Sequence, residues 1–271
     1  MPELPEVETS RRGITPHIKG KRLSRVEIRQ PSLRWPIPIE ECQALVGEKL
    51  IDVRRRAKYI LLNFESGTLL LHLGMSGSLR VLDPSVEPIK HDHVDLIFDD
   101  ESMLRLNDPR RFGALLWAGR EPYKHVLLTS LGPEPDDPAF NTDYCYQKSR
   151  GKKQAIKQWI MDGHVVVGVG NIYANESLFK AGIHPSRQAG KISRARYELL
   201  VAAIKTVISH AIEQGGTSLR DFTQADGKPG YFKQELAVYG RGDEPCVQCN
   251  TPLKATRHGQ RATVYCPNCQ S

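Results

Sequence analysis

The stretch YILLNFESGTLLLHL, residues 59–73, decides how the first half of the chain folds. Two runs rich in aliphatic residues are separated by the turn residues Glu65, Ser66 and Gly67, which is the pattern of two short strands joined by a hairpin. Several short strands at this spacing predict a β-sandwich or a barrel. The other runs of the same kind span residues 21–30, 49–54, 94–98, 103–106 and 113–118.

A helix is predicted ahead of these strands, at about residues 5–13. Pro5 suits the first turn of a helix, because the N–H that it lacks would have no partner there. The carboxylates of Glu6 and Glu8 favour the same place, because the N-terminal end of a helix carries a partial positive charge.

The second half of the chain is predicted to be helical. Three prolines in the loop at residues 132–138 make it the best domain boundary. Apolar residues then recur at helical spacing, and Ser193 and Gly215 are the expected cap and end of the longest helix. A polar, glycine-bearing loop is expected at residues 217–231. The predicted helices span residues 140–148, 153–161, 171–181 and 193–214, and the predicted domains span 1–132, 133–235 and 236–271.

Charge and composition narrow the functional class. The 271 residues include 38 Lys and Arg against 31 Asp and Glu, a formal net charge of +7, which favours a polyanionic partner such as nucleic acid. No apolar run in the sequence reaches the ~18 residues that a membrane helix needs. The first residues, MPELPEVETSRR, carry acids and prolines in place of a basic and then apolar leader. We therefore expect a cytoplasmic protein with no membrane partner.

Two basic clusters are candidate phosphate-binding surfaces, because fixed cations release the counterions condensed on a polyanion. We expect both clusters to be phosphate-binding surface; a solvated basic surface without a partner is the alternative. The first cluster comprises Arg54, Arg55, Arg56 and Lys58, and the second comprises Lys148, Arg150, Lys152, Lys153 and Lys157.

Four cysteines form a candidate zinc site. Cys246 and Cys249 make one CxxC pair, Cys266 and Cys269 make another, and sixteen residues separate the pairs. This is the spacing of a tetrahedral zinc ribbon, in which each pair directs two thiolates at one ion. Because all four positions are filled, the ion is expected to be structural; disulfides or a redox pair are the alternative.

The zinc ribbon would brace a short basic hairpin at residues 256–263. Arg261 lies near its tip and is a candidate phosphate ligand, because a guanidinium can fork onto a phosphate. An ordinary solvated arginine is the alternative. The remaining cysteines, Cys42 and Cys145, stand alone and are expected to be buried small hydrophobes.

The amino terminus carries a candidate nucleophile. Initiator methionine is commonly removed before a small residue such as proline, which would leave Pro2 with a free secondary amine. An α-amino group titrates near ~8, so part of it is unprotonated at neutral pH, and a secondary amine forms a cationic iminium at an aldehyde-level carbon. Glu3 beside it is suited to relay protons. The alternative is a proline that only precedes a helix.

Several segments together resemble bacterial formamidopyrimidine-DNA glycosylase, the bifunctional repair enzyme for oxidised purines. They follow the order of the family and cover nearly the whole chain, from residue 2 to residue 269. The segments are residues 2–8 (PELPEVE), 56–59 (RAKY), 72–77 (HLGMSG), 108–113 (DPRRFG) and 168–176 (GVGNIYANE), and the cysteine quartet with Gln260 and Arg261.

The resemblance implies an α+β fold. It comprises an N-terminal β-sandwich with flanking helices, and a helical helix-two-turn-helix domain that ends in a zinc-ribbon β-hairpin. It also implies that Pro2 attacks C1′ of the damaged nucleotide and that Glu3 is the acid–base residue beside it.

The resemblance assigns DNA contacts as well. Lys58, Asn171 and Arg261 would hold the phosphates that flank the lesion, with His91 as a further DNA contact. Three more residues would fill the gap left by the extruded base, since apolar wedges lower the cost of the hole in the base stack. These are Met75 and Phe112 as wedges and Arg110 as the partner of the orphaned base.

Two other interpretations of these segments are less favoured. Residues 168–171 (GVGN) precede a helix as dinucleotide-binding loops do, but Tyr173 stands where the third glycine belongs, and no βαβ context surrounds it. His91 and His93 would share one face of a strand and could suggest a metal site, but no third ligand is identified.

The implied function is base-excision repair of damaged double-stranded DNA. Oxidised purines, such as 8-oxoguanine and formamidopyrimidines, would be flipped out and removed through a Schiff base on Pro2, and β,δ-elimination would then cleave the strand. The implied cofactor is one structural zinc ion, with no nucleotide cofactor, and the implied state is a monomer. Residues 217–231 would close over the lesion.

Two alternatives remain open. One is an endonuclease VIII-type glycosylase for oxidised pyrimidines, against which Leu4 and the glycine-bearing loop argue. The other is a zinc-ribbon DNA-binding protein without catalysis, which predicts binding to DNA but no covalent intermediate.

Overall fold

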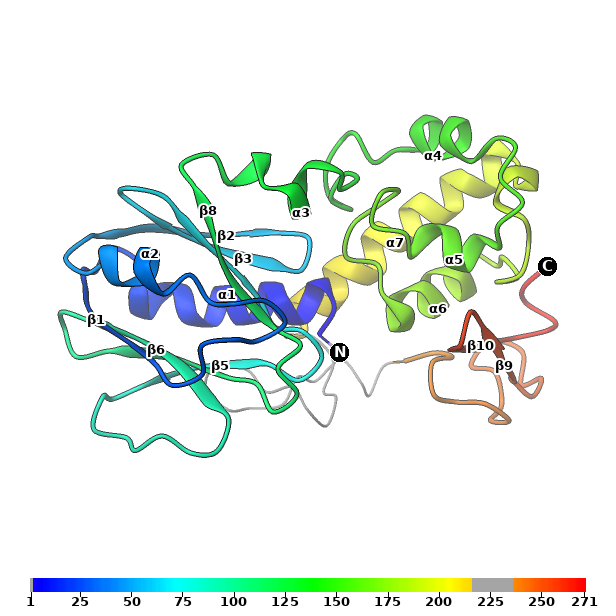
Figure 1. The fold of residues 1–271 in the computed structure, drawn as a ribbon. Coiled ribbons are helices and arrows are strands. Elements are labelled where there is room, and N and C mark those ends of the chain that lie inside the picture. Colours follow the sequence, from blue (N-terminus) through cyan, green and yellow to red (C-terminus); the bar gives the residue numbers. More distant parts are fainter. Residues whose placement is uncertain (1, 216–235) are drawn as a thin grey trace. The chain divides into compact units, whose positions relative to one another are not determined.

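The computed structural model describes residues 2–215 and 236–271, and these residues fall into two compact units. The first unit runs to Ser130, and the second comprises Leu131–Glu213 and the C-terminal segment from residue 236. Figure 1 labels most of the elements of the two units, which are described separately below. The limits expected for three domains, at residues 132/133 and 235/236, stay a prediction, and the loop expected at residues 217–231 lies outside the described residues.

Two antiparallel four-stranded sheets form the first unit. The strand order is β1-β6-β7-β5 in one sheet and β2-β3-β4-β8 in the other. Side chains from both sheets, such as Leu71 and Leu96, share one hydrophobic core, so the predicted sandwich is confirmed. The elements are α1 (Leu4–Ile18), β1 (Leu23–Ile28), α2 (Ile39–Ala44), β2 (Leu50–Arg56), β3 (Tyr59–Phe64), β4 (Thr68–His72), β5 (Ser78–Leu82), β6 (Asp92–Phe98), β7 (Met103–Asn107), β8 (Ala114–Gly119), the 3₁₀ turn η1 (Pro122–Lys124) and α3 (Val126–Thr129).

Helix α1 extends further than its sequence pattern predicts. Val7, Ile14 and Ile18 are at most 1 % exposed and belong to the core that the two sheets share. Gly13 and Pro16 are weak helix formers, and they led to a predicted end at residue 13. Burial of the last two apolar turns outweighs that local preference, because each buried aliphatic side chain contributes roughly 1.5–3 kcal/mol. The helix therefore continues to Ile18.

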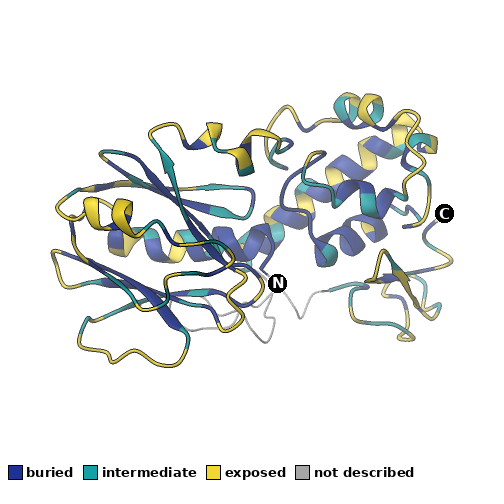
Figure 2. Cartoon of the chain, viewed as in Figure 1, coloured by how far each residue is buried: buried dark blue, intermediate teal, exposed yellow. Residues whose placement is uncertain are grey.

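The second unit consists of helices and a two-stranded hairpin. Helix α6 packs against α7 and against β10, and most of its residues are buried (Figure 2). The helices predicted in this half are confirmed, although the one expected at residues 153–161 is shorter. The elements are α4 (Thr142–Ser149), α5 (Ile156–Ile160), α6 (Asn171–Lys180), the 3₁₀ turn η2 (Ala189–Lys191), α7 (Arg194–Glu213), β9 (Lys254–His258) and β10 (Arg261–Tyr265).

Strand β5 was missed by the sequence analysis. Leu79 is the one fully buried residue of β5, and its neighbours Ser78 and Arg80 are half-buried polar residues. This is the pattern of a strand at the edge of a sheet with one buried face, and its five residues are too short to stand out. The short helices α2 and α3 were missed for the same reason of length.

None of the helices among residues 2–215 and 236–271 is long and apolar enough to cross a membrane.

Candidate functional site

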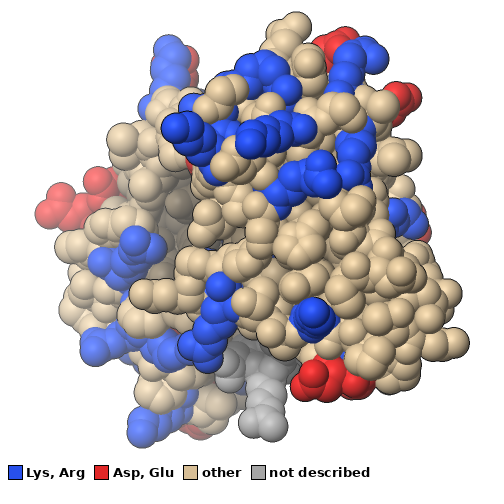
Figure 3. All heavy atoms as spheres, turned by 90° about the vertical axis from the view of Figure 1, so that its right-hand side faces the viewer, with Lys and Arg blue, Asp and Glu red and all other residues tan. Residues whose placement is uncertain are grey.

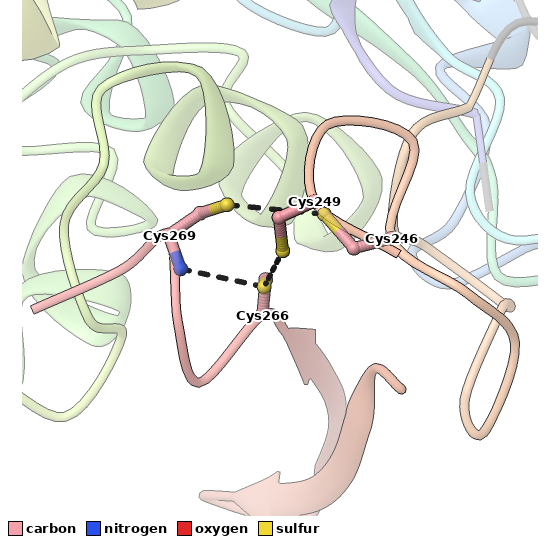
Figure 4. A group of neighbouring side chains, drawn as sticks. All are labelled: Cys246, Cys249, Cys266 and Cys269. Atoms are coloured by element: carbon pink, nitrogen blue, oxygen red, sulfur yellow. Dashed lines mark hydrogen bonds between the residues drawn. The ribbon is translucent and has the colours of Figure 1, made fainter. Parts of the chain in front are cut away.

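The four cysteines of the second unit converge on one point. Their sulfur atoms all lie within 4.8 Å of one another, and they point toward each other in Figure 4. The Sγ atoms of Cys249 and Cys266 are 3.5 Å apart, and those of Cys246 and Cys269 are 3.9 Å apart. Four thiols at these distances fit a tetrahedral zinc ion and leave no position for water or substrate, so the site is structural.

A small apolar cluster supports the zinc site. Cys246 and Cys266 are buried together with Phe179 of α6, Val238 and Leu253. Because Phe179 belongs to the helical part, the cysteine knuckles and the helices share one core. The other two cysteines, Cys42 and Cys145, are also buried, as predicted, and burial raises the pKa of each thiol to about 12.

The hairpin β9–β10 presents Arg261 at its tip. Arg261 pairs with His258 across the hairpin, so the turn consists of Gly259 and Gln260 alone. Both have positive φ, 53° and 63°, which is the conformation of a type I′ turn. Arg261 is exposed at the start of β10, where a guanidinium is free to meet a phosphate.

Lys157 corrects the prediction of a solvated basic cluster. It is 1 % exposed, and its Nζ donates to the carbonyl of Ala262 and to the hydroxyl of Thr263, each at 2.7 Å. The ammonium lies buried against the hairpin, since its hydrogen-bond partners satisfy it there. The prediction that Lys157 contacts DNA from a solvated surface is therefore wrong. The exposed members of that cluster are Lys148, Arg150, Lys152 and Lys153.

Lys and Arg side chains remain prominent on the surface. On the face shown in Figure 3 they are spread more widely than Asp and Glu side chains. This distribution agrees with the formal net charge of +7 and with a polyanionic partner.

Asn171 begins helix α6 immediately after a glycine turn. Gly168 adopts a φ of +79°, and Gly170 is the N-cap, so the first amides of α6 lack side-chain capping. The buried Oδ1 of Asn171 has no hydrogen-bond partner among the described residues. Asn175, one turn later, donates to the carbonyl of Asn171 and accepts from the N–H of Val264 in β10. One side chain thus connects the start of α6 with the hairpin that carries Arg261.

Pro2 and Glu3 lie directly before α1 in the first unit, and both are buried. Glu3 is the N-cap, and its N–H donates to the carboxylate of Glu6 at 2.8 Å in a reciprocal capping box. This pairing fixes the backbone at the position where the predicted nucleophile and its acid–base neighbour follow one another.

Glu8 of α1 connects this terminus to the turn that carries Lys58. Its carboxylate accepts from Arg55 at 3.1 Å, and Arg55 also donates to the carbonyl of Ala57 at 3.0 Å. Burial alone would raise the pKa of Glu8, but hydrogen bonds from Arg11 and Arg12 outweigh it and lower the pKa to about 2. Arg55 is thus used inside the unit, which corrects its prediction as phosphate-binding surface.

Lys58 is half-buried in the tight turn between β2 and β3. It affects the neighbouring His72, whose pKa is lowered from 6.5 to about 4 by burial and by the charges of Lys58 and Arg34. The neutral imidazole accepts from the N–H of Gly74 at 3.0 Å through Nδ1. His72 is therefore affected by the charge of Lys58 and is bonded to the backbone that precedes Met75.

Met75, Arg110 and Phe112 lie on two neighbouring turns of the first unit. Met75 is 37 % exposed and Phe112 is 49 % exposed, although both are large and apolar. Arg110 donates to the carbonyl of Met75 at 3.0 Å. Two large apolar side chains that are exposed on neighbouring turns, together with an arginine, fit a surface that inserts into a base stack.

His91 precedes β6 with a φ of +74°, and its ring lies 6.1 Å from that of His93. His93 is buried, and its Nε2 lies 2.9 Å from the carbonyl oxygen of Asp108. Among the described residues, the cysteine quartet is the one group placed to hold a metal ion. The two histidines therefore do not form a metal site there.

Ser76 and Asp108 were not among the candidates predicted from the sequence. Both stand inside quoted motifs, but their contacts join segments that are distant in the sequence. Asp108 precedes Pro109 in a motif with two arginines, and its position in the sequence does not indicate that it is buried. Only the structure shows that its side chain is fully buried.

Family models match three parts of the chain in this order. The "Formamidopyrimidine-DNA glycosylase N-terminal domain" matches residues 1–115, the "Formamidopyrimidine-DNA glycosylase H2TH domain" matches 131–223, and the "Zinc finger found in FPG and IleRS" matches 243–271. The chain belongs to the formamidopyrimidine-DNA glycosylase family. Curated relatives of that name from Alcanivorax borkumensis and Methylococcus capsulatus are 59 % and 57 % identical over 270 residues, each covering 100 % of both chains.

Solved structures of this family share the fold. The Lactococcus lactis Fpg in complex with abasic-site DNA is 30 % identical with a TM-score of 0.92, and covers 100 % of both chains. An L. lactis complex with DNA containing an oxidised pyrimidine is 31 % identical with a TM-score of 0.91 and the same coverage. The Thermus thermophilus MutM (Fpg) protein is 36 % identical with a TM-score of 0.88, covering 99 % of this chain and 98 % of that one.

The family membership settles the class of protein. This member of the family is a base-excision repair enzyme for oxidised purines with abasic-site lyase activity, and its cysteine quartet fits one structural zinc ion. The interpretations as a pyrimidine-specific enzyme and as a non-catalytic zinc-ribbon protein are set aside in favour of the purine glycosylase.

Proposed function

We propose that the chain removes the damaged base through the amine of Pro2, once Met1 has been cleaved. The observation that carries this proposal is the position of Pro2 and Glu3, immediately ahead of a helix whose capping box holds the backbone of Glu3. A bond would form between the Pro2 nitrogen and C1′ as the bond to the base breaks, and the C1′–O4′ bond of the sugar would then open, leaving a cationic iminium at C1′ and a hydroxyl at C4′. Glu3 would carry the proton that this exchange requires.

The iminium then makes elimination possible. The cation acidifies C2′, so loss of a proton there expels the 3′ phosphate, and a second elimination expels the 5′ phosphate. The product is a gap with phosphates on both ends. No redox cofactor or nucleotide is needed, since each phosphate leaves with the electron pair of its own C–O bond and no net oxidation or reduction occurs.

The proposed DNA contacts come from both units. Lys58 in the first unit and Asn171 and Arg261 in the second would hold the phosphates that flank the lesion, and His91 would add a further contact. Support comes from the exposed Arg261 at a hairpin tip and from Asn171 at the uncapped start of α6. Met75, Arg110 and Phe112 would fill the gap in the base stack.

A trapping experiment tests the nucleophile. Borohydride added to the protein with duplex DNA containing 8-oxoguanine opposite cytosine would reduce the iminium to a stable protein–DNA adduct. Pro2→Glu should abolish the adduct, because a large second residue retains Met1 and leaves the nitrogen an amide. Pro88→Ala, on an exposed loop, is the matched control and should trap as the unaltered protein does. An undiminished adduct with Pro2→Glu would falsify the assignment.

Lesion preference needs a quantitative comparison, because an L. lactis relative was solved with oxidised-pyrimidine DNA. Single-turnover rates on 8-oxoguanine and on thymine glycol, in the same duplex, give the ratio directly. We expect the purine to be excised faster, and the reverse order would favour the pyrimidine branch. We further propose a cytoplasmic monomer acting without a nucleotide cofactor, and light scattering of the purified protein tests the monomer.

A further inference from the structure

Two connections cross between the sheets of the sandwich side by side. The first connection, residues 73–77, joins β4 to β5, and the second connection, residues 108–113, joins β7 to β8. Strands β4 and β8 pair in one sheet, with His72 opposite Ala114, and strands β5 and β7 pair in the other, with Ser78 opposite Asn107. Both ends of the two connections are therefore neighbours.

The backbones of the two connections touch. A Cβ atom added to Gly74, which has a φ of +63°, would lie 2.4 Å from the carbonyl carbon of Phe112. A Cβ atom on Gly113 would lie 2.8 Å from the carbonyl oxygen of His72 and 2.9 Å from Oδ2 of Asp108. Any side chain at either glycine would push the connections apart, so their contact depends on these glycines.

The carboxylate of Asp108 bonds to both connections. It is 0 % exposed. Oδ1 accepts from the hydroxyl of Ser76 in the first connection at 3.0 Å, and Oδ2 accepts from the N–H of Gly113 in the second at 2.7 Å. Its N–H donates to the carbonyl of His91 at 3.1 Å. A buried carboxylate is costly unless it is hydrogen-bonded, and here each oxygen has a donor from a different connection.

The side chains that the connections expose are the three assigned to the gap in the base stack. Met75 is the neighbour of Ser76 in sequence, and Arg110 and Phe112 lie between Asp108 and Gly113. The hydrogen bond from Arg110 to the carbonyl of Met75 joins the same two connections at the surface. The carboxylate thus lies beneath the surface from which all three side chains project.

We propose that Asp108 is a positioning residue that fastens the two connections into one rigid unit before DNA is bound. Met75, Arg110 and Phe112 then enter the gap together, and no ordering of separate loops is needed at that step. The proposal rests on the proposed role of these three residues in filling the gap. A role in stability alone would also explain a buried carboxylate, so the test must separate the two.

Two substrates separate them. Duplex DNA with 8-oxoguanine requires a gap to be filled, whereas a single-stranded oligonucleotide with a preformed abasic site has no base stack around the lesion. Asp108→Asn keeps the volume of the side chain but presents an amide N–H₂ to one of the two donors. We expect the single-turnover excision rate on the duplex to fall roughly tenfold to a hundredfold, as loss of a buried hydrogen-bond pairing implies. Cleavage of the single strand should stay within about twofold.

Asp95→Asn is the matched control. Asp95 is another fully buried carboxylate of the sandwich, and Arg105 donates to both its oxygens at 2.8 Å, but it bonds to neither connection. Melting temperatures of both variants report the general loss of stability. If Asp108→Asn and Asp95→Asn lower duplex and single-strand activities by equal factors, Asp108 acts through stability alone and the proposal is overturned.

Further variants keep the test decisive. Should Asp108→Asn fail to fold, Ser76→Ala removes one hydrogen bond only and should give the same pattern at smaller size. Combining Ser76→Ala with Met75→Ala should give less than the sum of the single effects, because both act on one unit; strict additivity contradicts the proposal. If Met75→Ala and Phe112→Ala both excise 8-oxoguanine at the rate of the unaltered protein, these side chains do not fill the gap. That outcome contradicts the proposed function itself and is distinct from a failure of this inference alone.

Discussion

The Nζ of Lys157 lies 2.7 Å from the carbonyl oxygen of Ala262, the residue that follows Arg261 in the zinc-bearing segment. This hydrogen bond joins helix α5 to strand β10. Together with the bond from Val264 to Asn175, it attaches the hairpin to the helices at two points on one strand. The hairpin is thus fixed from the helical side as well as from the zinc site.

Lys157→Met should loosen the hairpin without releasing zinc. A hydrogen bond from a charged group contributes about 1.5–3 kcal/mol, so the β10 amides should exchange faster with solvent and DNA affinity should fall. Hydrogen exchange measures the loosening of the hairpin, a zinc assay measures metal retention, and a DNA titration measures the affinity. Lys153→Met removes an equal charge from an exposed site and is the control for hydrogen exchange, because it should leave the exchange of the β10 amides unchanged. Unchanged exchange in β10 would show that the zinc site alone orders the hairpin.

Arg261→Ala should lower the salt dependence of DNA binding. A phosphate contact releases about one counterion, so the slope of log Kd against log salt should fall by about one. Titrations on the same duplex at several salt concentrations measure it. Arg257→Ala, an exposed arginine on the other strand of the hairpin, should change the slope less. Equal slopes for Arg261→Ala and the unaltered protein would rule out the phosphate contact.

Cys249→Ala should remove the bound zinc. Three thiolates leave a tetrahedral site open, so metal near one equivalent should be lost and the ribbon should unfold. Metal analysis and DNA binding report the two consequences. Cys145→Ala, a buried cysteine outside the quartet, should keep its zinc. Full DNA binding by a zinc-free Cys249→Ala protein would contradict a role for the ribbon in binding.

Glu8 should make the protein less stable in acid. Its pKa is about 2 in the folded chain against 4.5 for a free glutamate, so its contribution is present above pH 4.5 and is lost as the pH falls toward 2. The free energy of unfolding, measured by denaturant titration between pH 6 and pH 2, should fall more steeply for the unaltered protein than for Glu8→Gln. Parallel curves would mean that the ion pairs of Glu8 with Arg11 and Arg55 do not stabilise the fold.

His72 should titrate near pH 4 in the folded protein. Its depressed pKa means that the unfolded chain takes up a proton first, so stability falls as the pH drops from 6.5 through 4. Lys58→Met should raise this pKa, because it removes one of the two nearby positive charges. Imidazole NMR shifts measure the pKa, and Lys124→Met, which lies outside the groups that shift it, should leave it in place. A pKa near 6.5 in the unaltered protein would contradict the buried, neutral imidazole.

Local patterns were enough to predict most of the elements. Strand β3 and the neighbouring strands were predicted because short runs of aliphatic residues are separated by turn residues. The zinc quartet was found for a similar reason, since each CxxC pair is set by a spacing of three residues. These features depend on neighbours in sequence, and the sequence contains all of them.

Contacts between distant segments were not predictable in the same way. Lys157 stands in a run of exposed lysines, and nothing in that run indicates that it alone is buried against residues 262 and 263. Arg55 likewise belongs to a run of arginines, but its partner Glu8 is on a different element. A net charge taken from the sequence treats all lysines and arginines alike. Only the structure distinguishes the side chains that are buried and paired inside the protein from those that are exposed.

The sequence by itself determined most of the strands and helices along the chain, the zinc ligands and the family of glycosylases. The tertiary structure alone decided which charged side chains bind inside the protein, and it brought Asp108 within hydrogen-bond distance of both Ser76 and Gly113. The physical reason is the range of the interactions. Periodicity and ligand spacing act over a few residues, whereas a buried carboxylate takes its partners from whichever segments the packed sheets place beside it.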